Sequence, residues 1–250
     1  MSSQRRRKLD AVVAQLQLDY GPRAIRRAGP DEHAEVVGRI PTTFAELDRA
    51  LGGGLPQGRL TEISGPATSG KLTLAAKVIS AAHRADGDAL AAWVDLSRTC
   101  DPDYLDRCGI TLDRLLVVRP ASLADALAVT LHLVRSNALA VLVFDRFGAN
   151  ANQVRAAVAE EDGMLARLPQ LLSGTATAAV FLSDPREPSS ALAHAAAVRI
   201  SISRERWIMR DADVRGYQSL AEIVKNRHGH AGVRVAVHII FNGTVRGDGL

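Results

Sequence analysis

Residues 65–73 read Gly-Pro-Ala-Thr-Ser-Gly-Lys-Leu-Thr, and two glycines and a lysine at this spacing are typical of a loop that binds phosphate. Glycine at positions 65 and 70 lets backbone N–H groups turn toward phosphate oxygens, and Lys71 supplies positive charge. Residues 59–64 before the loop alternate as a strand does, and residues 74–82 after it have helical spacing. The helix N-terminus adds its dipole to anion binding. The sequence therefore predicts a nucleotide site formed by Gly65, Pro66, Ala67, Thr68, Ser69, Gly70, Lys71, Leu72 and Thr73.

The residue after the lysine is Leu72, where such loops usually carry Ser or Thr. The hydroxyl at that position normally holds Mg²⁺. An isobutyl side chain cannot ligate a hard cation. The loop therefore favours ATP binding over ATP hydrolysis.

Composition limits the class of protein. The chain has 250 residues, 47% of them hydrophobic but only 4% aromatic, so we expect one substantial aliphatic core. A formal net charge of +4 favours an anionic partner such as nucleic acid. Cys100 and Cys108 have neither redox nor zinc spacing and are interpreted as reduced thiols. No apolar run approaches the length of a membrane span, and we expect a cytoplasmic protein.

The chain divides into a short N-terminal segment and a main domain. Residues 9–25 place Leu9, Val12, Val13 and Leu16 on one helical face, and Tyr20-Gly21-Pro22 is a stop signal. We expect residues 1–28 to form an oligomerisation segment and residues 29–250 to form the core.

Short apolar runs alternate with helical segments through the core. Such runs suit strands that are buried on both faces, as in a mostly parallel sheet with helices on both sides. The expected strands are residues 59–64, 89–95, 115–118, 141–145 and 178–182, and the expected helices include residues 122–136 and 162–172. Residues 200–203, 220–225 and 234–241 predict an antiparallel C-terminal extension.

Several of these segments together resemble the RecA recombinase family. The similar parts are residues 16–27, the run Thr42–Asp48, the lead-in Leu51–Arg59, the phosphate loop, Asp101–Tyr104 and Val224–Arg227. The resemblance covers nearly the whole chain and implies a RecA-like core. The chain stops at Leu250, where the resemblance places the family's C-terminal DNA-gating domain.

The resemblance also implies roles for single residues. It assigns Asp101 and Tyr104 to the adenine base, although Asp101-Pro102 also suits a helix cap. It assigns Asp145 to Mg²⁺, which the family's aspartate organises through water, and Thr73 is the second candidate metal group. Lys225 and Arg227 match groups that reach the γ-phosphate of a neighbouring subunit in a filament, and the alternative for them is a solvated strand end.

Three departures from the family concern catalysis and DNA binding. Ser97 occupies the position of the glutamate that activates water, and a hydroxyl is a poor base at neutral pH. Ser183-Asp184 replaces the Asn-Gln pair that senses the γ-phosphate. The DNA-binding loops are compact, at residues 186–190 and at residues 148–161, which include Arg155. We therefore expect very slow or no ATP turnover and no recombinase activity.

Arg204, Arg206 and Arg210 flank Trp207, a mixture that can stack on single-stranded nucleic acid. We expect instead a core tryptophan between surface arginines.

Short, catalytically weakened RecA-like chains resemble the ImuA type of accessory protein from bacterial inducible-mutagenesis cassettes. The first hypothesis is therefore a damage-tolerance adaptor that binds ATP, works with an error-prone polymerase or a RecA-like recombinase, and binds DNA weakly if at all. The alternatives are an active DNA-dependent ATPase, in which Thr73 and Asp145 assemble Mg²⁺, and a modulator of RecA filaments. A homo-oligomer is compatible with all three.

Overall fold

The computed structural model describes residues 3–21, 37–146, 158–210, 213–241 and 245–246. It divides into two compact units, residues 1–36 and residues 37–250, which we describe separately. The expected division after residue 28 stays a prediction.

The described part of the first unit, residues 3–21, forms the helix α1 (Ser3–Tyr20). It begins six residues before the predicted start at Leu9, because arginine, lysine and glutamine are good helix formers and carry the helix through the basic cluster. It ends before Gly21, whose φ of 89° is typical of a residue that terminates a helix. Leu9 and Val12 are exposed on α1. Among the described residues, no helix combines the length and the apolar character that crossing a bilayer requires.

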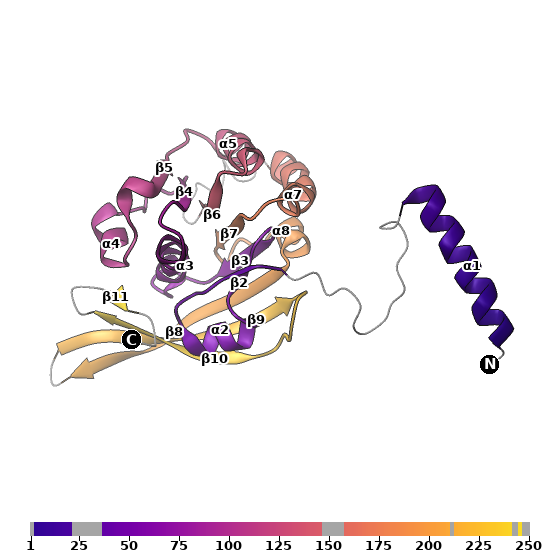
Figure 1. Cartoon of the computed structure of the whole chain (residues 1–250). Helices are drawn as coiled ribbons and strands as arrows, with labels where there is room; N and C mark the ends of the chain where they lie inside the picture. The colour runs from indigo at the N-terminus through magenta and orange to yellow at the C-terminus, as the bar shows by residue number, and fades with distance from the viewer. Residues whose placement is uncertain (1–2, 22–36, 147–157, 211–212, 242–244, 247–250) are drawn as a thin grey trace. The chain divides into compact units, whose positions relative to one another are not determined.

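The second unit is built on one sheet with the strand order β11-β10-β9-β8-β3-β7-β6-β4-β5 (Figure 1). The strands β8, β3, β7, β6, β4 and β5 run parallel, and β9, β10 and β11 extend the sheet antiparallel. The sheet strands are β3 (Leu60–Ser64), β4 (Leu90–Asp95), β5 (Leu115–Val118), β6 (Leu139–Asp145), β7 (Ala178–Ser183), β8 (Val198–Arg210), β9 (Asp213–Asn226), β10 (Arg234–Phe241) and β11 (Val245–Arg246). A separate antiparallel pair joins β1 (Arg39–Ile40) to β2 (Leu55–Pro56). The predicted fold class is confirmed.

Helices cover both faces of the sheet (Figure 1). On one face α3 packs against β6 and β7, and on the other α5 and α7 pack against β6 and β3. Among the described residues, the helices of this unit are α2 (Ala45–Leu51), α3 (Lys71–Ala85), α4 (Pro102–Arg107), the 3-10 turn η1 (Leu112–Arg114), α5 (Leu123–Ser136), α7 (Val158–Leu172) and α8 (Ser190–Ala195).

The central strands alternate between two apolar cores, because successive side chains of a strand point to opposite faces. In β6, Val141 and Val143 join the core under α3, and Leu142 and Phe144 join the core under α5 and α7. All four side chains are fully buried. The unbroken apolar runs in the sequence therefore correspond to strands that are covered on both faces. Cys100 and Cys108 are buried free thiols, and burial raises the pKa of each to about 11.

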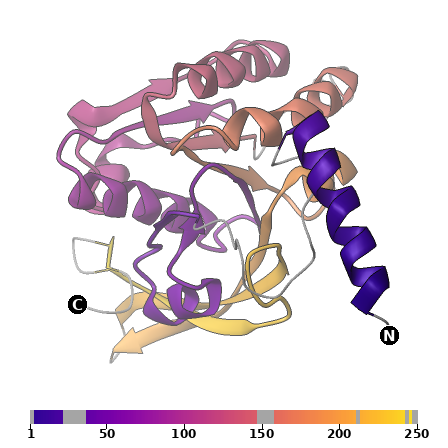
Figure 2. The ribbon, with the colours of Figure 1, turned by 45° about the vertical axis from the view of Figure 1, so that its right-hand side comes forward.

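The antiparallel extension is longer than predicted. Strands β8 and β9 have 13 and 14 residues and form a hairpin that continues beyond the predicted segments 200–203 and 220–225. Figure 2 shows this hairpin, in orange and yellow, extending away from the helical layers. Residues 204–210 are mostly exposed, so the hairpin lacks the one-sided apolar alternation that makes a strand visible in a sequence.

Candidate nucleotide site

The phosphate loop connects β3 to α3, as the sequence predicts. Gly70 has a φ of 97°, and a Cβ atom there would lie 2.6 Å from Ile239. A Cβ atom on Gly65 would lie 2.4 Å from the carbonyl oxygen of Ile202. Position 65 therefore requires glycine because the backbone of β8 passes too close for a Cβ atom, and position 70 favours glycine because its φ is positive.

Lys71 is folded back onto its own loop. Its Nζ donates hydrogen bonds to the carbonyls of Gly65 at 2.7 Å and Pro66 at 3.0 Å. Burial lowers the pKa of Lys71 to about 8, and the carboxylates of Asp145 and Asp184 partly oppose that shift. A phosphate group would favour the charged ammonium, so we expect nucleotide binding to restore the lysine pKa toward its usual range.

The sheet holds the loop from two sides. The N–H of Gly65 donates to the carbonyl of Ser183 on β7 at 3.2 Å, and the Ser219 hydroxyl on β9 donates to the carbonyl of Ser69 at 2.8 Å. The Ser69 hydroxyl is itself buried and has no partner among the described residues. Two obligatory glycines, a buried lysine and an unpaired buried hydroxyl fit a phosphate ligand.

The hydroxyl of Thr73 is turned toward Tyr104. Its Oγ1 lies 2.5 Å from the Tyr104 hydroxyl. Burial raises the pKa of Tyr104 and of Tyr217, and Thr73 partly opposes the shift of both, so both phenols stay protonated. Tyr104 is half-buried and packs against the core under α3. Tyr217 lies near the loop without any local signal in the sequence, because it belongs to the distant strand β9.

Direct Mg²⁺ ligation does not fit these side chains. Leu72 offers no oxygen, and the Thr73 hydroxyl is engaged with the Tyr104 phenol. Asp145 is fully buried and accepts a hydrogen bond from the Thr99 hydroxyl at 2.9 Å. The described residues contain no cluster of three His, Cys, Asp or Glu side chains that could hold a metal ion. The assignment of Thr73 and Asp145 to Mg²⁺, for Asp145 through water, stays a prediction.

A chain of hydroxyls replaces the expected catalytic base. The Ser97 hydroxyl lies 3.0 Å from the Thr99 hydroxyl, which donates to Asp145. Because Thr99 has only one hydroxyl proton, Ser97 is the donor in the first bond. Asp95 anchors the same segment by accepting from the N–H of Thr99 and from Arg119 Nε. The group at the base position is therefore a hydroxyl that donates to Thr99, and a hydroxyl is a poor base at neutral pH.

Asp101 caps α4. Its carboxylate accepts from the N–H of Asp103 at 3.0 Å, and Pro102 occupies the first turn. This is the helix-cap alternative that the sequence left open. An adenine contact by Asp101 or Tyr104 stays a prediction.

Asp184 and Arg186 form an ion pair beside the phosphate loop that sequence reasoning missed. Arg186 Nη2 lies 2.7 Å from Asp184 Oδ2, and Nε lies 3.1 Å and 3.2 Å from the two carboxylate oxygens. The hydrogen bonds from Arg186 hold the pKa of Asp184 below its usual range. A charged pair two residues apart in a turn has no periodic signal in the sequence.

A second ion pair is buried where β6 ends. Arg146 Nη1 lies 2.7 Å and 2.8 Å from the two carboxylate oxygens of Glu161 on α7, and Arg146 Nη2 donates to the carbonyl of Glu187 at 3.1 Å. Desolvation raises the pKa of Glu161, and Arg146 opposes that shift. The pair joins β6, α7 and the segment after β7.

Most of the predicted loop 148–161, Arg155 included, lies outside the described residues.

Lys225 and Arg227 bind the C-terminal end of α8. Lys225 Nζ donates to the carbonyls of Ala193 at 2.8 Å and His194 at 3.1 Å, and Arg227 Nη2 donates to that of His194 at 2.8 Å. Cations are favourable at the end of a helix, where carbonyl groups lack partners. Burial and neighbouring arginines lower the pKa of Lys225. A role in a neighbouring subunit's nucleotide site stays a prediction.

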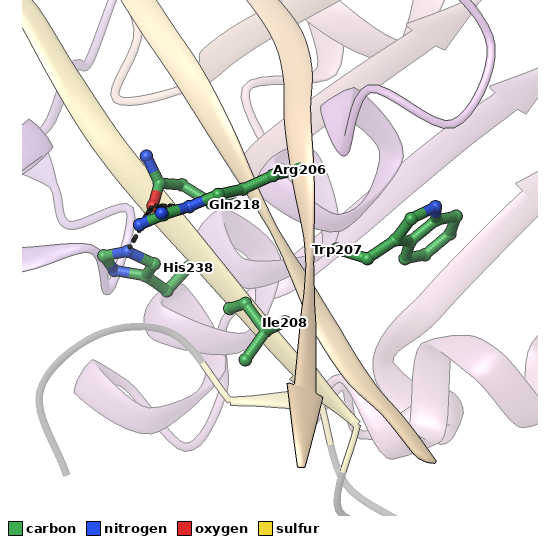
Figure 3. Close-up of a pocket in the computed structure, with 5 residues that line it drawn as sticks. All are labelled: Arg206, Trp207, Ile208, Gln218 and His238. Carbon is green, nitrogen blue, oxygen red and sulfur yellow. Dashed lines mark hydrogen bonds between the residues drawn. The ribbon is translucent and has the colours of Figure 1, made fainter. Parts of the chain in front are cut away.

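Trp207 is not in the core, so that expectation is wrong. Its side chain is 48% exposed, Arg204 lies 4.3 Å from the centre of its ring, and Tyr217 packs edge-on at 5.9 Å. Figure 3 shows that Arg206, Gln218 and His238 gather on one side of the hairpin, whereas Trp207 points to the other. Together with Ile208 these residues line a pocket of about 390 Å³, in which Arg206 and His238 already hydrogen-bond to Gln218.

Comparisons with known proteins agree with this geometry. The RecA N-terminal domain family matches residues 7–246. Protein RecA of Paenarthrobacter aurescens is 35% identical over 250 residues, covering 89% of this chain and 71% of that protein. Protein RecA of Pseudarthrobacter chlorophenolicus is 36% identical over 251 residues, with 89% and 70% covered. A crystal structure of the RadB recombinase has a TM-score of 0.67 at 19% identity, covering 83% of this chain and 98% of that one, which shows a common fold.

Proposed function

The chain belongs to the RecA family, and we propose that it is an accessory protein of DNA damage tolerance that binds ATP but hydrolyses it poorly or not at all. The phosphate loop carries this proposal, because the glycines and the lysine that bind phosphate are present and correctly placed. The groups that activate water and hold metal are replaced by Ser97 and Leu72.

The proposed role within the family is that of an adaptor. A RecA-like core that stays bound to nucleotide presents a constant surface, which suits docking onto an error-prone polymerase or a RecA-like recombinase. The segment between β7 and α8 spans only residues 184–189, which leaves little room for a DNA-reading loop. We therefore infer that direct DNA binding is weak. Docking onto a partner protein with little direct DNA binding is the accessory function that we propose, and it corresponds to the ImuA type of translesion accessory protein.

We expect ATP hydrolysis at the background rate, with and without single-stranded DNA. Removing the base and a metal-organising group affects two components that act together, so restoring one of them will rescue little. Phosphate release should match that of the Lys71→Ala variant, which serves as the control. DNA-stimulated release that disappears in Lys71→Ala would identify an active DNA-dependent ATPase instead.

We also infer that α1 mediates contact with a RecA-like chain, either a second copy or a recombinase. Leu9, Val12, Val13 and Leu16 share one helical face, and an isolated helix of this length is marginal in water. We expect Val12→Asp to abolish assembly in light scattering and recombinase pull-down, as should a chain that starts at Gly29. Ala14→Asp, on the opposite side of α1, is the matched control. Unchanged assembly of Val12→Asp in both assays would place the contact elsewhere.

A further inference from the structure

The turn after β7 places an arginine beside the phosphate loop. Gly65 N–H is hydrogen-bonded to the carbonyl of Ser183, so the first residue of the loop adjoins the residue before Asp184. Asp184 then accepts from both the backbone N–H and the guanidinium of Arg186. A carboxylate that binds two groups of one guanidinium fixes its plane as well as its position. The arginine head is therefore held at the edge of the loop.

Part of this guanidinium is still available for a ligand. The fork on Asp184 uses Nε and Nη2, and no described residue accepts a hydrogen bond from Nη1. Arginine has five N–H donors in a planar arrangement that matches phosphate geometry. The Arg186 side chain is 80% exposed, whereas that of Asp184 is 7% exposed. The carboxylate thus anchors one edge of the guanidinium while the other edge stays accessible.

The charges around the loop favour such a group. The two positive charges of Lys71 and Arg186 are balanced by the two negative charges of Asp145 and Asp184. The other three groups all act electrostatically on Lys71. A bound triphosphate adds several negative charges to this neutral group. At other phosphate loops Mg²⁺ held by the protein offsets them, but Leu72 and the engaged Thr73 hydroxyl offer it no ligand here. A cation from the protein can offset this charge instead.

We propose that Arg186, held by Asp184, binds the terminal phosphate of a bound nucleoside triphosphate, and that this chain binds ATP without Mg²⁺. This inference rests on the proposed nucleotide function and adds the group that distinguishes ATP from ADP. The diphosphate lacks the third phosphate group, so its binding depends on the loop and Lys71 and little on Arg186. Tight ATP binding then needs no catalytic metal, which agrees with a chain that lacks the catalytic base.

Isothermal titration calorimetry of the full chain with ATP and with ADP, each in EDTA and in excess Mg²⁺, tests the proposal. We expect the ATP Kd to change by less than about threefold between EDTA and Mg²⁺. Arg186→Gln should weaken ATP binding by about tenfold or more, as expected for loss of a charge-assisted hydrogen bond, and change ADP binding by less than about twofold. Arg186→Lys should restore part of the loss, because the charge returns without the planar fork.

Arg206→Gln is the matched control, because Arg206 is also exposed and is bound through its guanidinium, in this case by Gln218. An ATP affinity that requires Mg²⁺, or an Arg186→Gln variant that binds ATP as the Arg206→Gln variant does, would overturn the proposal while leaving nucleotide binding intact. Absence of binding heat for both nucleotides in every condition would overturn this proposal and the nucleotide function together. Because Arg186 is largely exposed, its substitution leaves the fold in place for the measurement.

Discussion

Lys71→Ala is expected to weaken ATP and ADP binding at least a hundredfold, which corresponds to about 2.7 kcal/mol. The ammonium is the buried cation of the phosphate loop, and it already lies within hydrogen-bonding distance of the carbonyls of Gly65 and Pro66. The measurement is calorimetry together with thermal unfolding at nucleotide concentrations about 100 times the Kd of the unmodified chain, where binding adds about 2.7 kcal/mol of stability. That stabilisation should fall to about 0.4 kcal/mol or less in Lys71→Ala.

Arg84→Ala is the control for this variant, because Arg84 is an exposed cation at the other end of the same helix. It should retain the full nucleotide-induced stabilisation. Lys71→Ala that still binds nucleotide with unchanged affinity would mean that phosphate does not occupy the loop.

The pH dependence of nucleotide binding follows from the same lysine. With a pKa of about 8 in the free chain, Lys71 loses its proton above pH 8, and the affinity should fall by up to about tenfold per pH unit from there. Stability without nucleotide should change in the opposite direction. Between pH 8 and 10.5 the unfolded chain binds more protons at this lysine than the folded chain does, so the lysine's contribution to the free energy of unfolding rises with pH.

Glu161→Leu is expected to lower the free energy of unfolding by about 3–5 kcal/mol, the usual cost of leaving one member of a buried ion pair without its partner. The Arg146 side chain is 4% exposed and that of Glu161 is 3% exposed. Arginine keeps its proton in proteins, so Arg146 would remain a buried charge without its partner. Urea unfolding followed by circular dichroism measures the change. Glu160→Leu, at the exposed neighbouring position on α7, is the matched control and should change stability by less than about 0.5 kcal/mol.

Arg146→Met separates the charge from the packing of this pair. Without the guanidinium, the pKa of Glu161 should rise further, because desolvation is the largest influence on it. The folded chain then binds more protons than the unfolded chain, so the loss of stability should shrink as the pH falls from 8 to 5. In Glu161→Leu no such recovery is expected. An equal pH dependence in the two variants, or a loss in Glu161→Leu no larger than in the control, would show that the buried pair does not contribute as described.

The phosphate loop and the central sheet were predictable because their signals are local in the sequence. Gly65, Gly70 and Lys71 stand within seven residues, and the backbone geometry that they serve is set by those residues themselves. The apolar runs that form β6 and β7 are buried on both faces, so neither needs a particular partner to be recognised as a strand. The long hairpin was underestimated because its outer part is exposed on both faces.

The chemistry around the loop was decided by tertiary contacts. The hydroxyl of Thr73 contacts that of Tyr104, which is 31 residues away in the sequence. Arg146 pairs with Glu161, and no periodic pattern in the sequence links these two positions. Such contacts depend on strand order, strand register and side-chain rotamers, none of which has a local sequence signal. The sequence by itself determined that the chain forms a parallel sheet with a phosphate loop. Only the tertiary structure decided which polar groups around that loop are already paired and which remain available to a ligand, because hydrogen bonds between distant residues form only after the sheet has brought their strands together.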